Sequence, residues 1–130
     1  MAKKKSNTPY YIIGFIVIFI GIILLINWQN SLPGKYDNFA QCLVDSEIKM
    51  YSAWWCGHCQ AQKKDFGRSF KVIEDGGAHV ECSPNDSKII SEFCKSEGIT
   101  GTPSWKLSDE TILRGRQSLL TLAQATGCTL

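Results

Sequence analysis

Two cysteines three residues apart, Cys56 and Cys59, stand where an apolar stretch gives way to a polar one. Residues 48–55 before them are mostly apolar and aromatic and predict a buried strand, and residues 60–66 after them predict a helix. A helix N-terminus favours negative charge, so it would hold the first sulfur as a thiolate, the species that attacks a disulfide. The spacing therefore predicts a redox-active dithiol at a strand-to-helix junction.

A long apolar segment precedes this dithiol. Residues 10–28 are 19 residues without a charged side chain, and a helix of that length spans roughly 28 Å, about the thickness of the bilayer core. The alternative is a cleaved signal peptide, but such peptides have a shorter apolar region, about 7–15 residues, and no Ala-x-Ala site follows here. We expect a basic cytoplasmic tail at 1–9, a transmembrane signal anchor at 10–28, a linker at 29–35 and a folded domain at 36–130.

Three lysines, Lys3, Lys4 and Lys5, set the expected orientation. Because positive charge stays inside, the N-terminus should be cytoplasmic and the domain should lie on the exported side of the inner membrane. Without these lysines the chain has 11 Lys and Arg against 12 Asp and Glu, which gives no case for a nucleic-acid surface. Six cysteines also fit an oxidising compartment.

The domain alternates predicted helices and strands. Hydrophobic spacing, capping residues and Gly or Pro breaks predict helices near 37–45, 56–70, 89–97 and 119–126, and strands near 48–54, 78–82, 102–107 and 111–115. This order predicts an α/β fold, with helical crossovers between some strands and an antiparallel hairpin near the C-terminus.

Three segments resemble the thioredoxin family. They are residues 53–59 (Ala-Trp-Trp-Cys-Gly-His-Cys), residues 98–103 (Gly-Ile-Thr-Gly-Thr-Pro), and the final hairpin and helix. The likeness covers roughly residues 36–128, and the Cys-Gly-His-Cys tetrapeptide is similar to that of protein disulfide isomerases. The resemblance implies a thioredoxin fold, with a central mixed β-sheet flanked by helices. It also implies a thiol–disulfide oxidoreductase that uses its own Cys56–Cys59 disulfide, with no other cofactor and no metal.

The tetrapeptide suggests three catalytic residues. We expect Cys56, exposed at the helix N-terminus, to be the nucleophile. Cys59 should be more buried and should resolve the mixed disulfide. His58 would stabilise the Cys56 thiolate and so make the disulfide more oxidising, although a side chain that only points to solvent is the alternative.

The resemblance also implies a substrate-binding surface beside the dithiol. Pro103 would be a cis-proline packed against the active-site disulfide. Thr102 would present its backbone to an incoming peptide by strand-like pairing. Trp55 and Gly57 would complete this surface.

Four further cysteines, Cys42, Cys82, Cys94 and Cys128, allow three pairings. We favour Cys82–Cys94, across a short loop from a strand to the next helix, with Cys42–Cys128 tying the first domain helix to the C-terminus. Each would contribute about 2–4 kcal/mol. The alternatives are that one pair relays electrons, or that two of these cysteines join the dithiol in a zinc site.

A narrower resemblance surrounds these cysteines. Residues 39–43, 80–83, 93–95 and 127–128 look like the thioredoxin-like domains that accompany bacterial vitamin K epoxide reductase homologues. That likeness implies exported cysteine-containing proteins as substrates, and a quinone-linked membrane oxidase of the vitamin K epoxide reductase type as the partner that reoxidises the domain. The alternatives are a reductant of the same fold, serving cytochrome maturation or disulfide repair, and a non-catalytic metal-binding or adaptor module.

Two features depart from the thioredoxin pattern. The usual first strand is absent or very short. Six positions before the first active-site cysteine, thioredoxins carry an acidic residue that helps proton transfer to the buried thiol, and this chain has Met50 there. That route for the proton is therefore missing. His79, in a predicted strand, is expected to be structural.

Overall fold

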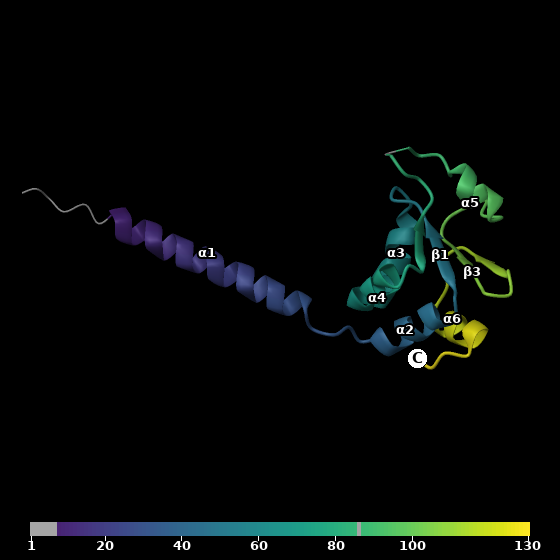
Figure 1. Ribbon diagram of the computed structural model, residues 1–130, viewed down its shortest axis with the longest axis horizontal. Coiled ribbons are helices and arrows are strands. Elements are labelled where there is room, and N and C mark those ends of the chain that lie inside the picture. The colour runs from purple at the N-terminus through teal and green to yellow at the C-terminus, as the bar shows by residue number, and fades with distance from the viewer. Residues whose placement is uncertain (1–7, 86) are drawn as a thin grey trace, which may run out of the picture. The chain divides into compact units, whose positions relative to one another are not determined.

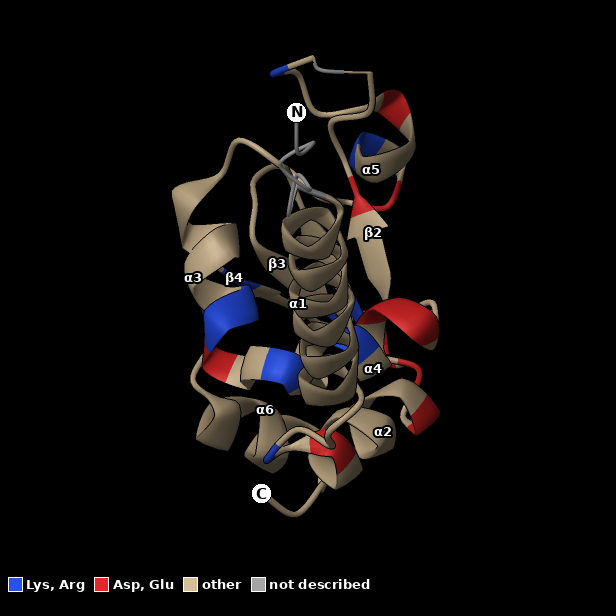
Figure 2. Ribbon diagram, turned by 90° about the vertical axis from the view of Figure 1, so that its left-hand side faces the viewer, with Lys and Arg blue, Asp and Glu red and all other residues tan. Residues whose placement is uncertain are grey.

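The computed structural model describes residues 8–85 and 87–130, so most of the predicted basic tail lies outside the described residues. The chain divides after Leu32 into two units. The described part of the first unit contains the helix α1 (Thr8–Asn30), which carries no charged residue (Figure 2). Its residues Pro9–Asn30 are long and apolar enough to cross a membrane. The helix therefore qualifies as a membrane span or signal anchor, and it continues two residues beyond the predicted end at Trp28.

The second unit is built on a four-stranded mixed sheet in the order β2-β1-β3-β4 (Figure 1). The strand β1 (Lys49–Ser52) pairs in parallel with β2 (His79–Glu81) and antiparallel with β3 (Ser104–Lys106). The last strand, β4 (Ile112–Arg114), forms the expected hairpin with β3. The predicted α/β fold with a central mixed sheet is confirmed.

Six helical segments accompany the sheet: α2 (Asp37–Asp45), α3 (Gly57–Phe66), the 3-10 turn η1 (Gly67–Ser69), α4 (Phe70–Asp75), α5 (Glu92–Ser96) and α6 (Leu119–Thr126). The single helix predicted near 56–70 is wrong. It breaks at Gly67, whose φ of +57° is a left-handed conformation that glycine adopts readily.

The helix predicted near 89–97 is also too long. It begins only at Glu92, because Ser91 caps its N-terminus in an extended conformation. The Ser91 N–H donates to the carbonyl of Cys82 at 2.7 Å. That bond ties the residue to the end of β2 and stops the helix from starting earlier.

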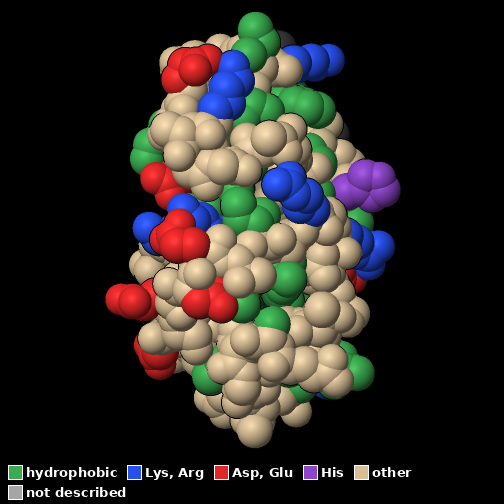
Figure 3. Space-filling model, turned by 90° about the vertical axis from the view of Figure 1, so that its right-hand side faces the viewer, with side chains coloured by type: hydrophobic (Ala, Val, Ile, Leu, Met, Phe, Trp, Pro, Cys, Tyr) green, Lys and Arg blue, Asp and Glu red, His purple; other side chains and the backbone are tan. Residues whose placement is uncertain are grey.

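Two hydrophobic cores lie on the two faces of the sheet. Met50 of β1 belongs to the larger core, together with residues of α2, α3, α4 and α6. Tyr51, which points to the opposite face, belongs to a smaller core with Cys82, Cys94 and Ile99. The sheet therefore separates the helix that carries the dithiol from the layer that carries the Cys82–Cys94 disulfide. Figure 3 shows the surface on the right-hand side of the view in Figure 1, where acidic, basic and hydrophobic side chains occur together.

Candidate active site

The dithiol lies at the start of α3. Cys56 caps the helix N-terminus, and its Sγ accepts a hydrogen bond from the Cys59 N–H at 3.2 Å. The helix dipole and this N–H both favour negative charge on the Cys56 sulfur. The first sulfur of the dithiol therefore lies at the N-terminal end of α3, as the sequence predicts.

The two thiols differ in burial. Cys59 is fully buried, and its burial, together with its hydrogen bond to Cys56, raises the pKa of the Cys59 thiol to about 11. Cys56 is 7% exposed, so it is less accessible than the sequence predicts, although it is still the outer of the two sulfurs. Both cysteines are free thiols. This asymmetry suits an outer nucleophile and an inner resolving thiol.

The Thr102–Pro103 segment faces the dithiol. The bond between these two residues is cis, and Pro103 is fully buried. The Cys56 thiol donates a hydrogen bond to the Thr102 carbonyl at 3.4 Å. Two segments 46 residues apart in sequence are thus brought together at one sulfur.

The other predicted site residues form a rim around the dithiol. Trp55 is 40% exposed, and its indole N–H donates to Ser83 Oγ at 3.0 Å. Gly57 opens α3, and a side chain added there would meet no neighbouring atom. His58 is exposed, and within the described part of the chain its ring makes no hydrogen bond or ion pair. The rim therefore holds the tryptophan in place and leaves the histidine in solvent.

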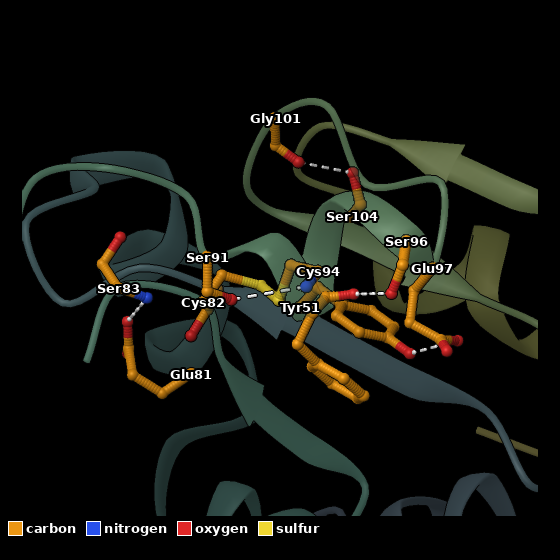
Figure 4. The surroundings of a disulfide bond; sticks show 12 residues. Tyr51, Glu81, Cys82, Ser83, Ser91, Cys94, Ser96, Glu97, Gly101 and Ser104 are labelled. Atoms are coloured by element: carbon orange, nitrogen blue, oxygen red, sulfur yellow. Dashed lines mark hydrogen bonds between the residues drawn. A yellow bond between two sulfur atoms is a disulfide. The ribbon is translucent and has the colours of Figure 1, made fainter.

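The remaining four cysteines form two disulfides, Cys42–Cys128 and Cys82–Cys94. These are the two pairings favoured from the sequence. Figure 4 shows Cys82–Cys94 among Tyr51, Ser83 and Ser91. No group of three His, Cys, Asp or Glu side chains among residues 8–85 and 87–130 is arranged to hold a metal ion.

Sequence reasoning missed two sets of residues near the site. Glu81 Oε1 accepts hydrogen bonds from the backbone N–H groups of Trp54 at 3.1 Å and Ser83 at 2.9 Å. His79 Nε2 lies 2.6 Å from Ser52 Oγ, on the strand that leads into the dithiol. The contacts of Glu81 and of His79 both depend on the parallel pairing of β1 with β2. This pairing aligns Met50 with His79 and Ser52 with Glu81. The only sequence signal was the alternating pattern of residues 78–82, which places the side chains of His79 and Glu81 on one face of the strand.

Several known proteins are similar to this chain, although no protein-family model matches it. The thiol-disulfide oxidoreductase LTO1 of Arabidopsis thaliana is 40% identical over 86 residues, which are 63% of this chain and 22% of that protein. A protein disulfide-isomerase of Oryctolagus cuniculus is 26% identical over 80 residues, 60% of this chain and 16% of the relative. A probable protein disulfide-isomerase A4 of Caenorhabditis elegans is 23% identical over 73 residues, 55% of this chain and 12% of the relative.

These relatives support a thioredoxin-like family. The names of all three describe thiol–disulfide chemistry, in agreement with a thioredoxin-like oxidoreductase that bears two free thiols. The chain spans about a fifth or less of the length of each relative. A thioredoxin-like dithiol of this geometry can exchange with a substrate disulfide through Cys56 and close on itself through Cys59.

Proposed function

We propose that this chain is a membrane-anchored thiol–disulfide oxidoreductase that oxidises exported proteins through a Cys56–Cys59 disulfide. The observation that carries the proposal is the asymmetric dithiol. Cys56 Sγ lies 3.2 Å from a helix N–H and 3.4 Å from the Thr102 carbonyl, while Cys59 is fully buried. The outer sulfur is placed to meet a substrate, and the inner sulfur is placed to leave when the Cys56–Cys59 bond breaks.

The reaction proceeds in two exchanges. A substrate thiolate attacks Cys56 Sγ of the oxidised domain, the Cys56–Cys59 bond breaks, and its electron pair passes to Cys59, which takes up a proton. A second substrate thiolate then attacks the substrate sulfur of the mixed disulfide, and Cys56 leaves as a thiolate. The substrate gains a disulfide and the domain is left as a dithiol.

Four residues around the dithiol are proposed to bind the substrate. The backbone of Thr102 pairs with the incoming peptide beside cis-Pro103. Gly57 leaves space over the start of α3, and Trp55 supplies an apolar surface at the rim. His58 is proposed to stabilise the Cys56 thiolate from the exposed side.

The reduced domain must then be reoxidised. We assign this step to a quinone-linked membrane oxidase of the vitamin K epoxide reductase type, in line with the sequence around the four disulfide-bonded cysteines. We further propose a basic cytoplasmic tail at 1–9, α1 as the anchor, a short linker after it, and a catalytic domain on the exported side of the membrane. The two structural disulfides support an oxidising compartment.

The reduction potential of the Cys56–Cys59 couple tests this proposal. The full chain in detergent is equilibrated with glutathione buffers, and the dithiol fraction is counted by alkylation and mass spectrometry. An oxidant should lie between about −180 and −120 mV. A value near −270 mV would instead mark a reductant and reverse the proposed electron flow.

A further inference from the structure

One carboxylate at the end of β2 is shared by two loops beside the dithiol. Glu81 Oε1 accepts the N–H of Trp54 at 3.1 Å and the N–H of Ser83 at 2.9 Å. Trp54 lies in the loop that leads from β1 into α3, and Ser83 lies in the loop that follows β2. In the described part of the chain this carboxylate forms no ion pair with a Lys or Arg side chain. The acceptor is therefore committed to the main chain of the two loops.

These two hydrogen bonds hold Trp55 through its main chain and through its ring. Trp54 immediately precedes Trp55, so the bond from the Trp54 N–H to Glu81 fixes the main chain on that side. Ser83 Oγ accepts the Trp55 indole N–H at 3.0 Å, so the bond from the Ser83 N–H to Glu81 fixes the partner of the ring. The residue nevertheless remains 40% exposed. The indole is therefore presented to solvent from a fixed position.

The other contacts of this loop tie it to α3, the helix that it enters. Gln60 Nε2, on α3, donates to the Trp54 carbonyl at 3.2 Å. The Cys56 N–H donates to the Ala53 carbonyl at 3.0 Å and closes the turn before the helix. The bond from the Trp54 N–H to Glu81 reaches β2 instead. Glu81 thus joins the loop that carries Trp55 to the sheet.

The register of the sheet explains why Glu81 reaches this loop. The strands β1 and β2 pair in parallel with Ser52 opposite Glu81, so both strands end at the same edge of the sheet. The side chain of the last residue of β2 then lies beside the residues that leave β1. Glu81 is exposed and belongs to neither hydrophobic core. A substitution at Glu81 can therefore remove the two hydrogen bonds and leave both cores intact.

We propose that Glu81 is a positioning residue that sets the affinity of the domain for peptide substrates through Trp55. The inference rests on the proposed exchange at the dithiol, in which Trp55 offers an apolar surface to the incoming chain. With Glu81 in place, the indole stays at the rim and covers apolar side chains beside the reacting cysteine of the substrate. Without Glu81 the ring is free to move, and binding must first order it, which weakens the affinity.

The experiment separates peptide binding from the reactivity of the disulfide. The oxidised full chain in detergent is mixed with a reduced peptide that carries two cysteines flanked by leucines, quenched in acid and analysed by mass spectrometry. The peptide concentration that gives half the maximal rate reports binding, and the maximal rate reports exchange at the dithiol. Reduced glutathione, which has no apolar side chain, reports the reactivity of the Cys56–Cys59 disulfide alone. A wild-type chain that reacts with neither thiol would contradict the proposed function itself.

The variants are Glu81→Ala and Glu81→Gln. Glu81→Ala removes the acceptor, so the half-saturating peptide concentration should rise about fivefold, the effect of losing one hydrogen bond of ordinary strength. The maximal rate and the rate with glutathione should stay at the wild-type values. Glu81→Gln keeps an oxygen that can accept both N–H groups, so it should restore most of the affinity. A general loss of order around the dithiol would change the rate with glutathione as well.

A double variant tests whether Glu81 acts through Trp55. Trp55→Ala should itself raise the half-saturating peptide concentration, and adding Glu81→Ala to it should cause no further rise. Asp109→Ala is the matched control, because Asp109 is another exposed carboxylate that accepts a backbone N–H, that of Thr111 at 2.9 Å. It should bind the peptide as the wild type does. The inference is overturned if Glu81→Ala binds the peptide normally, if its effect persists in full without Trp55, or if Asp109→Ala weakens binding equally.

Discussion

The indole N–H of Trp55 donates a hydrogen bond to Ser83 Oγ at 3.0 Å, and this joins the residue before the dithiol to the residue after Cys82. Ser83 in turn donates from Oγ to the carbonyl of Ile89 at 3.2 Å. The loop that follows β2 is closed by the Cys82–Cys94 disulfide. The rim of the dithiol is thus supported by a cross-linked loop from the other face of the sheet.

Ser83→Ala should loosen this rim. Loss of the acceptor for Trp55 should lower the free energy of unfolding by about 1 kcal/mol and raise the KM for a peptide disulfide. Denaturant unfolding and steady-state exchange with a peptide would measure the two effects. Ser108→Ala, an exposed serine near the hairpin turn, should leave both values unchanged. An unaltered KM in Ser83→Ala would show that the Trp55 position does not affect substrate binding.

Replacing Cys56 and replacing Cys59 should have opposite effects on the yield of mixed disulfide with a substrate. Cys59→Ser keeps the nucleophile but removes the resolving thiol, so a mixed disulfide between Cys56 and a substrate should accumulate. Cys56→Ser should form no such adduct, since Cys59 is fully buried. Non-reducing gels and mass spectrometry would detect the trapped partners, among them the proposed membrane oxidase. Equal adduct yields from the two variants would contradict the assigned roles.

The reduced domain should lose stability at alkaline pH. The pKa of Cys59 is about 11 in the folded state against 9.0 for an ordinary thiol, so the neutral thiol stabilises the fold below pH 9. This contribution, of the order of 3 kcal/mol, should disappear as the pH rises from 9 toward about 11. Denaturant unfolding across this range would measure it. Cys59→Ala should flatten the dependence, and a slope that survives in that variant would assign it to another group.

A second pH effect should appear on the acid side. Burial lowers the pKa of His79 below 6.5, so the unfolded chain binds a proton more readily than the folded domain does. The free energy of unfolding should therefore fall as the pH drops below 6.5, and His79→Gln should remove part of that fall. Unfolding curves between neutral and mildly acidic pH would measure the free energy of unfolding of the wild type and of His79→Gln. An equal fall in the two chains would show that His79 does not cause it.

The two structural disulfides should differ in their stabilisation. Cys42–Cys128 joins residues 86 apart in sequence, whereas Cys82–Cys94 joins residues 12 apart. Loop-closure entropy grows with the logarithm of loop length. Removing Cys42–Cys128, which closes the longer loop, should therefore lower the free energy of unfolding by about 1.5–2 kcal/mol more than removing Cys82–Cys94. Paired Cys→Ala variants of each bridge, compared by denaturant unfolding, would test this. Equal losses would mean that the unfolded chain keeps structure around Cys42 or Cys128.

Local sequence patterns predicted the elements that local physics controls. The apolar run before Cys56 forms β1, and Asp37 and Ser118 stand at the starts of α2 and α6. Three pairings of the other four cysteines were open from the sequence, and the one favoured there matches the two bridges in the structure. By contrast, the helix break at Gly67 depends on a left-handed backbone, which the apolar spacing around it does not reveal.

The contacts that were missed all depend on tertiary pairing. Ser52 and His79 are 27 residues apart and meet only because β1 and β2 pair in parallel with Met50 opposite His79. Cys56 is more buried than predicted, and the Thr102 carbonyl, 46 residues away in sequence, lies against its sulfur. No short window of sequence contains either relationship, because strand register and loop approach are set by the whole sheet.

The Cys42–Cys128 bridge also makes a covalent ring of everything between those two residues, including all four strands and the dithiol. A pull applied between the segment before Cys42 and the C-terminus would pass through the Cys42–Cys128 bridge and not through the strands. A single protease cut within the ring leaves both fragments linked. In the membrane-anchored enzyme proposed above, this bridge would protect the domain against mechanical unravelling and against loss after one cleavage.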